Sequence, residues 1–206
     1  MVDSARTVRA EQLSRFVPPA DGSGRHSAVL MLFASPGDVR QADVLLLQRA
    51  ATLRSHAGQA AFPGGATDPG DASASATALR EAAEEVGLDA NTVQVLAELP
   101  ALYLPPSGFV VTPVLGHWLR PHPVGVVDVA EVAGVRRLPV PALADPANRF
   151  TVRHPSGFVG PGFEVAGMFV WGFTAGLLDR LLRLAGWEQP WDRDRIRPVS
   201  DSTDPD

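Results

Sequence analysis

The segment 80–88, REAAEEVGL, follows a glycine pair by a short distance and constrains this chain more than any other stretch. Its periodicity predicts a helix over residues 74–86. At about 100° per residue, that helix places Glu81, Glu84 and Glu85 within one arc of roughly 100°. Any fold that contains this helix must therefore accommodate three carboxylates on one side of the helix.

Local physics opposes such a helix. Carboxylates three and four residues apart repel each other by about 0.2–0.5 kcal/mol per pair, and anions are disfavoured in the second half of a helix. A divalent cation reverses the sign of this repulsion, and clustered carboxylates with a backbone carbonyl suit Mg2+ or Mn2+. The alternative is a solvated acidic face, which is common in globular proteins. Leu79, Ala83 and Val86 lie on the other side of the helix, and we expect them to face the core.

The sequence FPGG, which ends at Gly65, is followed by the loop ATDPGDAS, and this loop leads into the helix. Glycines let backbone carbonyl and amide groups approach a ligand closely. A turn of this kind beside a carboxylate helix favours a site for a metal ion and a diphosphate over the solvated face.

The rest of the chain predicts an α/β (α+β) fold, a mixed β-sheet between helices, because strands outnumber helices and do not strictly alternate with them. Strands are expected within residues 27–34, 44–49, 92–99, 109–119, 126–140 and 167–173, and a closing helix within 174–186 with Thr174 as its N-cap. We expect an N-terminal arm over 1–26, a domain over 27–186 and a polar C-terminal tail over 187–206.

Composition excludes several functions. The net charge of −5 argues against a nucleic-acid partner. The chain has no cysteine, and all 18 basic residues are arginines, so thiol, Schiff-base and P-loop lysine chemistry are excluded. Neither a signal peptide nor a membrane-spanning run is found. We therefore expect a cytoplasmic enzyme or binding protein with no membrane partner.

The stretch GGATDPGDASASATALREAAEEVGL resembles the Nudix box, the signature of hydrolases that act on nucleoside diphosphates linked to another group. The matching positions are Gly65, Arg80, Glu81, Ala82, Glu84, Glu85, Gly87 and Leu88. Two departures occur in the first half. Asp71 stands where the family has a glutamate, and the gap from Asp71 to Arg80 is one residue longer than the pattern.

The upstream segment LLLQRAATLRSHAGQAAFPGG is similar to an extended signature of the coenzyme A pyrophosphatase branch of this family. The match is carried by Arg49, Leu53, His56, Gly58, Gln59, Phe62, Pro63, Gly64 and Gly65, whereas Leu47 stands where the branch has a threonine. YLPPSGFVVTPVLG and VWGFTAGLL also resemble this branch. The likeness covers most of residues 27–186 and implies a Nudix-like α/β/α sandwich.

The resemblance implies attack of water on phosphorus with the help of Mg2+ or Mn2+. Glu81 and Glu85 are the first candidate metal ligands, and Glu84 and the Gly65 carbonyl are the next. The catalytic candidates are Glu81, Glu84 and Arg80, and Arg80 is expected to orient the carboxylates. The general base is open between Glu81 and an acid from a loop outside the box.

Arg49, Arg54, His56 and Gln59 are the candidate substrate-binding residues. Arginine suits phosphate because of its bidentate fork. His56 and Gln59 have an alternative role, which is to hold the HAGQ turn by hydrogen bonds. Glu131 has two interpretations as well, an acid that reaches the metal or an ordinary surface glutamate.

Together these features predict a small-molecule nucleotide as partner and hydrolysis of the diphosphate of coenzyme A or its derivatives. The products would be 4′-phosphopantetheine and adenosine 3′,5′-bisphosphate. The alternatives are a Nudix hydrolase of ADP-ribose or a dinucleoside polyphosphate, and a non-catalytic nucleotide sensor. The sequence is also compatible with a homodimer.

Overall fold

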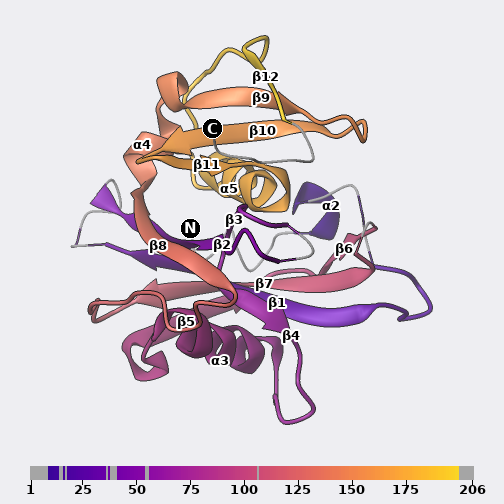
Figure 1. The fold of residues 1–206 in the computed structure, drawn as a ribbon, viewed down its shortest axis with the longest axis vertical. Helices are drawn as coiled ribbons and strands as arrows, with labels where there is room; N and C mark the ends of the chain where they lie inside the picture. The colour runs from indigo at the N-terminus through magenta and orange to yellow at the C-terminus, as the bar shows by residue number, and fades with distance from the viewer. Residues whose placement is uncertain are drawn as a thin grey trace.

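The computed structural model describes residues 9–199 except 14, 15, 17, 36, 38–40, 54, 55 and 106 (Figure 1). In chain order the elements are α2 (Ala10–Leu13), β1 (Arg25–Ala34), β2 (Asp43–Arg49), β3 (Ala60–Ala61), β4 (Gly64–Ala66), α3 (Ala74–Val86), the 3-10 helix η2 (Ala90–Thr92), β5 (Val93–Glu98), β6 (Leu102–Leu104), β7 (Phe109–Trp118), β8 (Val132–Pro139), α4 (Val140–Ala144), the 3-10 helix η3 (Pro146–Asn148), β9 (Arg149–Arg153), β10 (Val159–Val165), β11 (Met168–Val170), α5 (Gly172–Leu184) and β12 (Ile196–Pro198).

The described residues form a mixed eight-stranded sheet whose main path runs β3-β2-β1-β7-β5. Strands β4, β6 and β8 pair with β1, β7 and β2, respectively. β1 and β7 run parallel, and the other pairs of this sheet run antiparallel. Figure 1 shows α3 against one face of this sheet and α5 against the other. The arrangement confirms the predicted α/β (α+β) class with a mixed sheet between helices.

Strand β1 shows how the sequence builds both layers, because its side chains alternate between the two faces. Leu30 and Leu32 are fully buried in the core that contains α3. Met31 and Phe33 belong to the core that contains α5 and β10. A strand buried on both faces carries a continuous apolar run, which is why the segment after His26 is almost entirely hydrophobic.

A second sheet, in the order β11-β10-β9-β12, covers the far side of α5 (Figure 1). Three strands of this sheet, β9, β10 and β12, were not predicted from the sequence. The segment 187–199, expected to be part of a polar tail, instead packs on this sheet, since β12 pairs in parallel with β9 and Val199 is buried. The described part of that segment is thus integrated into the fold.

The second sheet also holds a buried charge, Arg149, which is completely inaccessible to solvent. Its guanidinium group pairs with Asp179 of α5. Nη1 lies 3.7 Å from Oε1 of Glu188, and the guanidinium carbon lies 4.7 Å from the ring centroid of Trp191. The C-terminal segment therefore supplies part of the surroundings of this charge.

The closing helix begins earlier than predicted. α5 starts at Gly172, with Trp171 in the N-cap position and no capping hydrogen bond from its side chain. Thr174 is buried inside the helix, so its assignment as N-cap was wrong. In the part of the chain that the structure describes, no helix combines the length and the apolar character needed to cross a membrane.

Candidate functional site

The glycine pair of FPGG forms strand β4, which lies against β1 with Gly64 opposite Val29 and Gly65 opposite Ala28. Gly64 has a φ of 157°, which residues with a side chain rarely adopt. A Cβ atom at Gly64 would lie 2.7 Å from the Cα of Val29. Only glycine therefore lets this short strand approach β1 so closely.

Helix α3 has the predicted bounds. Ser73 caps its N-terminus by accepting a hydrogen bond from the backbone of Ala76, and Gly87 ends it in the left-handed conformation. The predicted core face was wrong in part, because Ala83 is exposed whereas Ala78 and Ala82 are fully buried. The helix is thus rotated relative to the expectation, and one edge of its acidic side points into the protein.

That rotation buries Glu85, which is only 4% exposed. Its Oε2 accepts a 2.9 Å hydrogen bond from the backbone N–H of Gly64. Burial raises the pKa of Glu85 to about 8, the Gly64 hydrogen bond and Arg49 act in the opposite direction, and the negative charges of Glu81 and Glu131 add to the increase. The sheet side of α3 therefore holds a buried carboxyl group that lies close to other charges.

Glu81 lies over the second glycine of the pair. A Cβ atom at Gly65 would lie 2.5 Å from both carboxylate oxygens of Glu81, far inside van der Waals contact. Burial raises the pKa of Glu81, and the neighbouring Arg80 opposes that increase. The missing side chain of Gly65 thus makes the space that the Glu81 carboxylate occupies.

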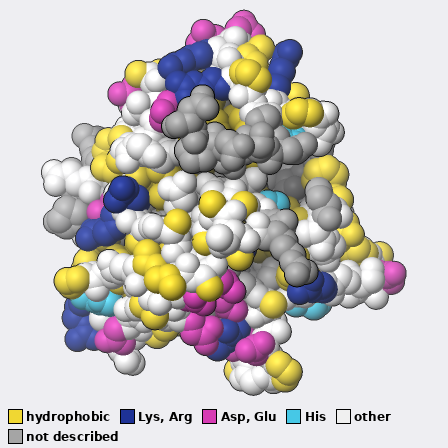
Figure 2. Space-filling model, in the orientation of Figure 1, with side chains coloured by type: hydrophobic (Ala, Val, Ile, Leu, Met, Phe, Trp, Pro, Cys, Tyr) yellow, Lys and Arg dark blue, Asp and Glu magenta, His cyan; other side chains and the backbone are white. Residues whose placement is uncertain are grey.

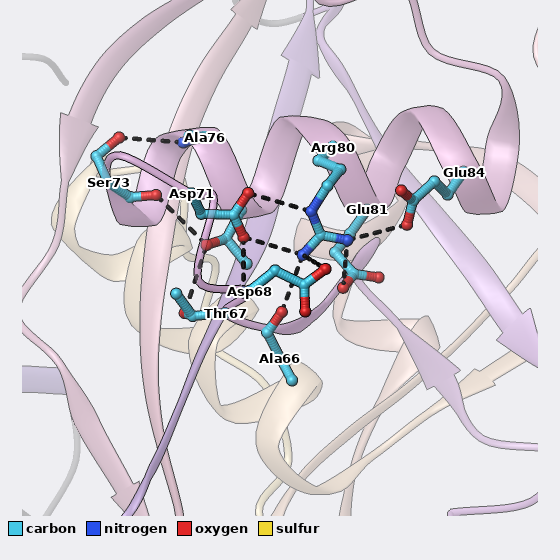
Figure 3. A network of polar contacts seen from close by, with 10 residues as sticks. Ala66, Thr67, Asp68, Asp71, Ser73, Ala76, Arg80, Glu81 and Glu84 are labelled. Atoms are coloured by element: carbon cyan, nitrogen blue, oxygen red, sulfur yellow. Dashed lines mark hydrogen bonds and ion pairs between the residues drawn. The ribbon is translucent and has the colours of Figure 1, made fainter.

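Arg80 connects the loop to the acidic side of the helix (Figure 3). Its Nε and Nη2 donate to the two oxygens of Asp71 at 3.1 and 3.0 Å, and Nη1 donates to Glu81 at 3.0 Å and to Glu84 at 2.9 Å. Nη2 also donates to the carbonyl of Ala66 at 3.0 Å. The guanidinium group therefore joins three carboxylates by hydrogen bonds, forms an ion pair with Asp68 at 3.8 Å, and contacts the end of β4.

The contact with Asp71 shows that the shorter acid reaches Arg80 despite the one-residue insertion. The hydrogen bonds from Arg80 are the largest cause that lowers the pKa of Asp71, to about 2, and the backbone of Asp68 contributes as well. Asp71 also raises the pKa of Arg80. Asp71 is therefore a bidentate hydrogen-bond partner of Arg80.

Glu84 differs from the other two glutamates of the helix. Its side chain is 58% exposed and pairs with Arg80 four residues earlier in the chain. Among the described residues, no group of three or more acidic or histidine side chains is assembled to hold a metal ion. The structure thus brings Glu81 and Glu85 to the glycine pair and leaves Glu84 at the outer side of Arg80.

The donor set at the glycine pair fits a hard divalent cation. Two partly or fully buried carboxyl groups, Glu81 and Glu85, both have raised pKa values, and Glu81 lies directly on the backbone of Gly65. Carboxylate and carbonyl oxygens are the ligands that Mg2+ and Mn2+ favour. A cation at this place would stabilise the charged forms of both carboxyl groups, which burial alone disfavours.

Arg49, predicted to bind substrate, lies at this site. It is the last residue of β2, where the pairing with β8 is interrupted by a bulge, and its positive charge lowers the pKa of Glu85. Its Nε is buried and has no hydrogen-bond partner among the residues that the structure describes. A buried guanidinium N–H without such a partner, close to carboxylates, is suited to donate a hydrogen bond to a phosphate oxygen.

The HAGQ turn is held by its own residues. Nδ1 of His56 lies 3.1 Å from Oε1 of Gln59, and the Gln59 N–H donates to the His56 carbonyl at 3.2 Å. The Gln59 carbonyl in turn accepts from the N–H of Arg49 at 2.9 Å, so the turn lies next to Arg49. These contacts support the role of His56 and Gln59 in holding the turn. Arg54 lies outside the described residues.

Glu131 belongs to the same region. Its negative charge contributes to the raised pKa values of both Glu81 and Glu85. Its carbonyl accepts a 2.8 Å hydrogen bond from the N–H of Ala50, next to Arg49, and a turn built by Asp128 precedes it. The sequence signal for this residue was an acid within the segment 126–140, where a strand was expected, and this signal does not distinguish it from a surface glutamate.

The acidic side chains form a visible surface feature. Figure 2 shows a patch of acidic side chains with a basic group among them, in the region where Figure 1 places α3. Hydrophobic side chains border this patch. The surface in the region of α3 therefore combines acidic, basic and hydrophobic side chains.

Comparison with known proteins gives consistent results. A family model described as NUDIX domain matches residues 24–158. The uncharacterized Nudix hydrolase NudL of Citrobacter koseri is 40% identical over 185 residues, which span 82% of this chain and 90% of the relative. The protein of the same description from Cronobacter sakazakii is 43% identical over 154 residues, which span 71% and 77%.

A solved structure with the same architecture is that of a Nudix hydrolase from M. smegmatis, RenU. It aligns with a TM-score of 0.52 at 24% identity and covers 86% of this chain and 98% of that protein. At this level of identity the likeness concerns the fold alone, and it confirms the expected sandwich around a mixed sheet.

Proposed function

The chain belongs to the NUDIX family of hydrolases, and on that premise we propose that it cleaves the diphosphate of coenzyme A or its derivatives. Cleavage would give 4′-phosphopantetheine and adenosine 3′,5′-bisphosphate. In this reaction a water oxygen bonds to one phosphorus atom, and the bridging oxygen leaves with the other phosphoryl group. The hydrolysis consumes one water molecule and needs one group that accepts the proton of this water.

Nudix hydrolases generally use divalent metal ions. Glu81, Glu85 and the carbonyl of Gly65 would hold Mg2+ or Mn2+ here, and Glu84 is the further ligand candidate. When bound, the ion supplies neutralisation of the diphosphate charge and a lower pKa for the attacking water. Arg80 keeps Glu81 in place through its contact at 3.0 Å.

The proton of the attacking water passes to a carboxylate, and Glu81 and Glu131 are the two candidates. Glu131 is the acid from a loop outside the box, and its backbone is fixed by Ala50. Arg49 donates a hydrogen bond to a phosphate oxygen through its buried Nε, for which the described part of the chain offers no partner. A general base has to lie within reach of the water, and both acids influence the charge of Glu85.

The observation that carries the assignment is the position of Arg49. Residues of the upstream signature, from Arg49 through the HAGQ turn to the glycine pair, are joined by hydrogen bonds to one another or to Glu85. The segment that resembles the coenzyme A branch is therefore in contact with the carboxylate helix. This continuity supports a role of the segment in choosing the diphosphate substrate.

The test is incubation of the protein with coenzyme A, dephospho-coenzyme A, ADP-ribose and diadenosine polyphosphates in the presence of Mg2+ or Mn2+. Products are identified by mass spectrometry. We expect coenzyme A to give the two phosphomonoesters with the highest kcat/KM. A higher kcat/KM for ADP-ribose would reject the coenzyme A assignment, and binding without cleavage of any compound would favour a nucleotide sensor.

The proposal includes a cytoplasmic location and a homodimer. Light scattering coupled to size-exclusion chromatography decides between one and two copies of the 21.8 kDa chain.

A further inference from the structure

The long connection from β7 to β8 passes along the C-terminal end of α3. The N–H of Gly125 donates to the carbonyl of Val86 and the N–H of Val127 donates to the carbonyl of Glu85, both at 3.1 Å. Carbonyl groups in the last turn of a helix lack partners within the helix, so these bonds fix the connection to α3. These two hydrogen bonds therefore hold the connection next to Glu85.

This connection exposes apolar side chains. Val126, Val127 and Val129 are 37%, 59% and 80% exposed, whereas Val124 of the same connection packs on the core. Exposure of neighbouring apolar groups costs free energy, and such patches mark binding surfaces. We call Val126, Val127 and Val129 the valine ridge.

The valine ridge is one end of a continuous line of hydrogen-bonded backbone. Gln59 contacts Arg49 at 2.9 Å, the neighbouring Ala50 contacts Glu131 at 2.8 Å, and Glu131 contacts Asp128 at 3.3 Å. Asp128 lies within the ridge sequence. These hydrogen bonds thus connect a polar end, which is the HAGQ turn with Arg49, through Glu131 to an apolar end, which is the valine ridge.

We propose that the valine ridge binds the neutral arm of the diphosphate substrate, together with an acyl group when the arm carries one. The proposal rests on the proposed function, since it assigns the two ends of the line to the two halves of an asymmetric diphosphate. The polar end with Arg49 receives the phosphate-rich nucleoside half. The apolar end receives the half that has no phosphate beyond the cleaved bond.

The arrangement predicts a preference for acyl thioesters over the free thiol. Each fully buried methylene group contributes a factor of about four in binding, so a partly buried chain gains several-fold. We expect KM to fall from coenzyme A to its acetyl and octanoyl thioesters while kcat stays similar, because the ridge binds an arm that does not react.

The experiment measures kcat and KM for these three compounds in wild type, in Val129→Ser, and in the double variant Val127→Ser/Val129→Ser. Val159→Ser is the matched control, since Val159 is also 59% exposed but belongs to β10 of the second sheet. Thermal unfolding verifies that each variant is folded. We expect the double variant to raise KM for the octanoyl thioester about fivefold or more and KM for free coenzyme A by a smaller factor, whereas Val159→Ser leaves all three KM values unchanged.

Two results overturn the ridge proposal alone: no dependence of KM on acyl length in wild type, or the same KM values in the double variant and in wild type. Failure of wild type to cleave any form of coenzyme A would overturn the proposed function and the ridge proposal together. The two failures are therefore distinguished by whether free coenzyme A is cleaved.

Discussion

The backbone N–H of Gly64 donates a 2.9 Å hydrogen bond to Oε2 of Glu85. This contact joins the glycine strand to the carboxylate helix across 21 positions of the chain. It also places the most buried acid of the helix at the site proposed for the metal ion, so both residues can be tested by substitution.

Glu85→Gln should lower kcat by about two orders of magnitude or more, because it removes a ligand charge at the proposed metal ion. Glutamine has nearly the same shape and keeps an oxygen for the Gly64 hydrogen bond, so the fold should persist. Steady-state kinetics and circular dichroism check both parts. A folded variant with near-normal kcat would contradict the role of Glu85.

Gly65→Ala should reduce activity about tenfold or more, since the new methyl group would overlap the carboxylate of Glu81. The matched control is Gly70→Ala in the following loop, where an added Cβ has no neighbour within 4 Å. Parallel measurement of kcat/KM and melting temperature separates displacement of Glu81 from loss of fold. Equal activities of the two variants would show that Glu81 does not need this space.

The metal-free protein should lose stability as the pH rises toward 8. The pKa of Glu85 is raised from 4.5 to about 8 on folding, so the folded state holds more protons than the unfolded state between these values. The contribution of Glu85 to the free energy of unfolding is fully present below about pH 4.5 and is lost as the pH rises through 8. The free energy of unfolding falls by at most about 1.4 kcal/mol per pH unit in this range.

Urea denaturation with a chelator from pH 5 to 8.5 measures this slope. Glu85→Gln should flatten it and should stabilise the metal-free protein at the alkaline end. A wild-type free energy of unfolding that rises with pH in step with the variant would exclude Glu85 as the titrating group.

Millimolar Mn2+ should raise the melting temperature, because the ion binds the folded site and relieves the repulsion between the carboxylates. A concentration tenfold above the dissociation constant stabilises by about 1.4 kcal/mol, or about 3–6 °C for a chain of this size. The double variant Glu81→Gln/Glu85→Gln should show no shift. The same shift in both proteins would place the ion elsewhere.

Dephospho-coenzyme A should be a poorer substrate than coenzyme A, since it lacks the 3′-phosphate that an arginine can bind. Arg49→Gln should reduce the ratio of kcat/KM for coenzyme A to kcat/KM for dephospho-coenzyme A without abolishing cleavage. The same test applies to Arg54→Gln. Arg153→Gln, an exposed position on β9, is the control. An unchanged ratio of kcat/KM values in both test variants would exclude these arginines as the source of the preference.

The helix of residues 74–86 and the longer strands of the first sheet were predictable, because periodicity and end residues define them locally. The short strands β3, β4 and β6 of that sheet were not predicted. Ser73 and Gly87 terminate α3 through their own conformations. The burial of Glu85 was not predictable, since carboxylates are expected to face solvent and the compensating N–H comes from Gly64, far away in the chain.

Three strands of the second sheet, β9, β10 and β12, were missed for a related reason. Residues 149–153 alternate between polar and apolar side chains, but this run is only five residues long. Residues 154–165 are rich in glycine and proline, which are uncommon inside strands. β12 is short, and it becomes a strand only through its pairing with β9. Pairing between distant segments is information that a local pattern does not contain.

This pairing has a consequence for the order of events during synthesis. β9 cannot find its parallel neighbour, and the buried Arg149 cannot meet Glu188 and Trp191, until a ribosome has released the segment up to residue 198. The carboxylate helix is translated more than 100 residues earlier. A nascent chain can therefore fold its Nudix box before the second sheet is complete. A chaperone or a protease would encounter the chain in this partly folded state.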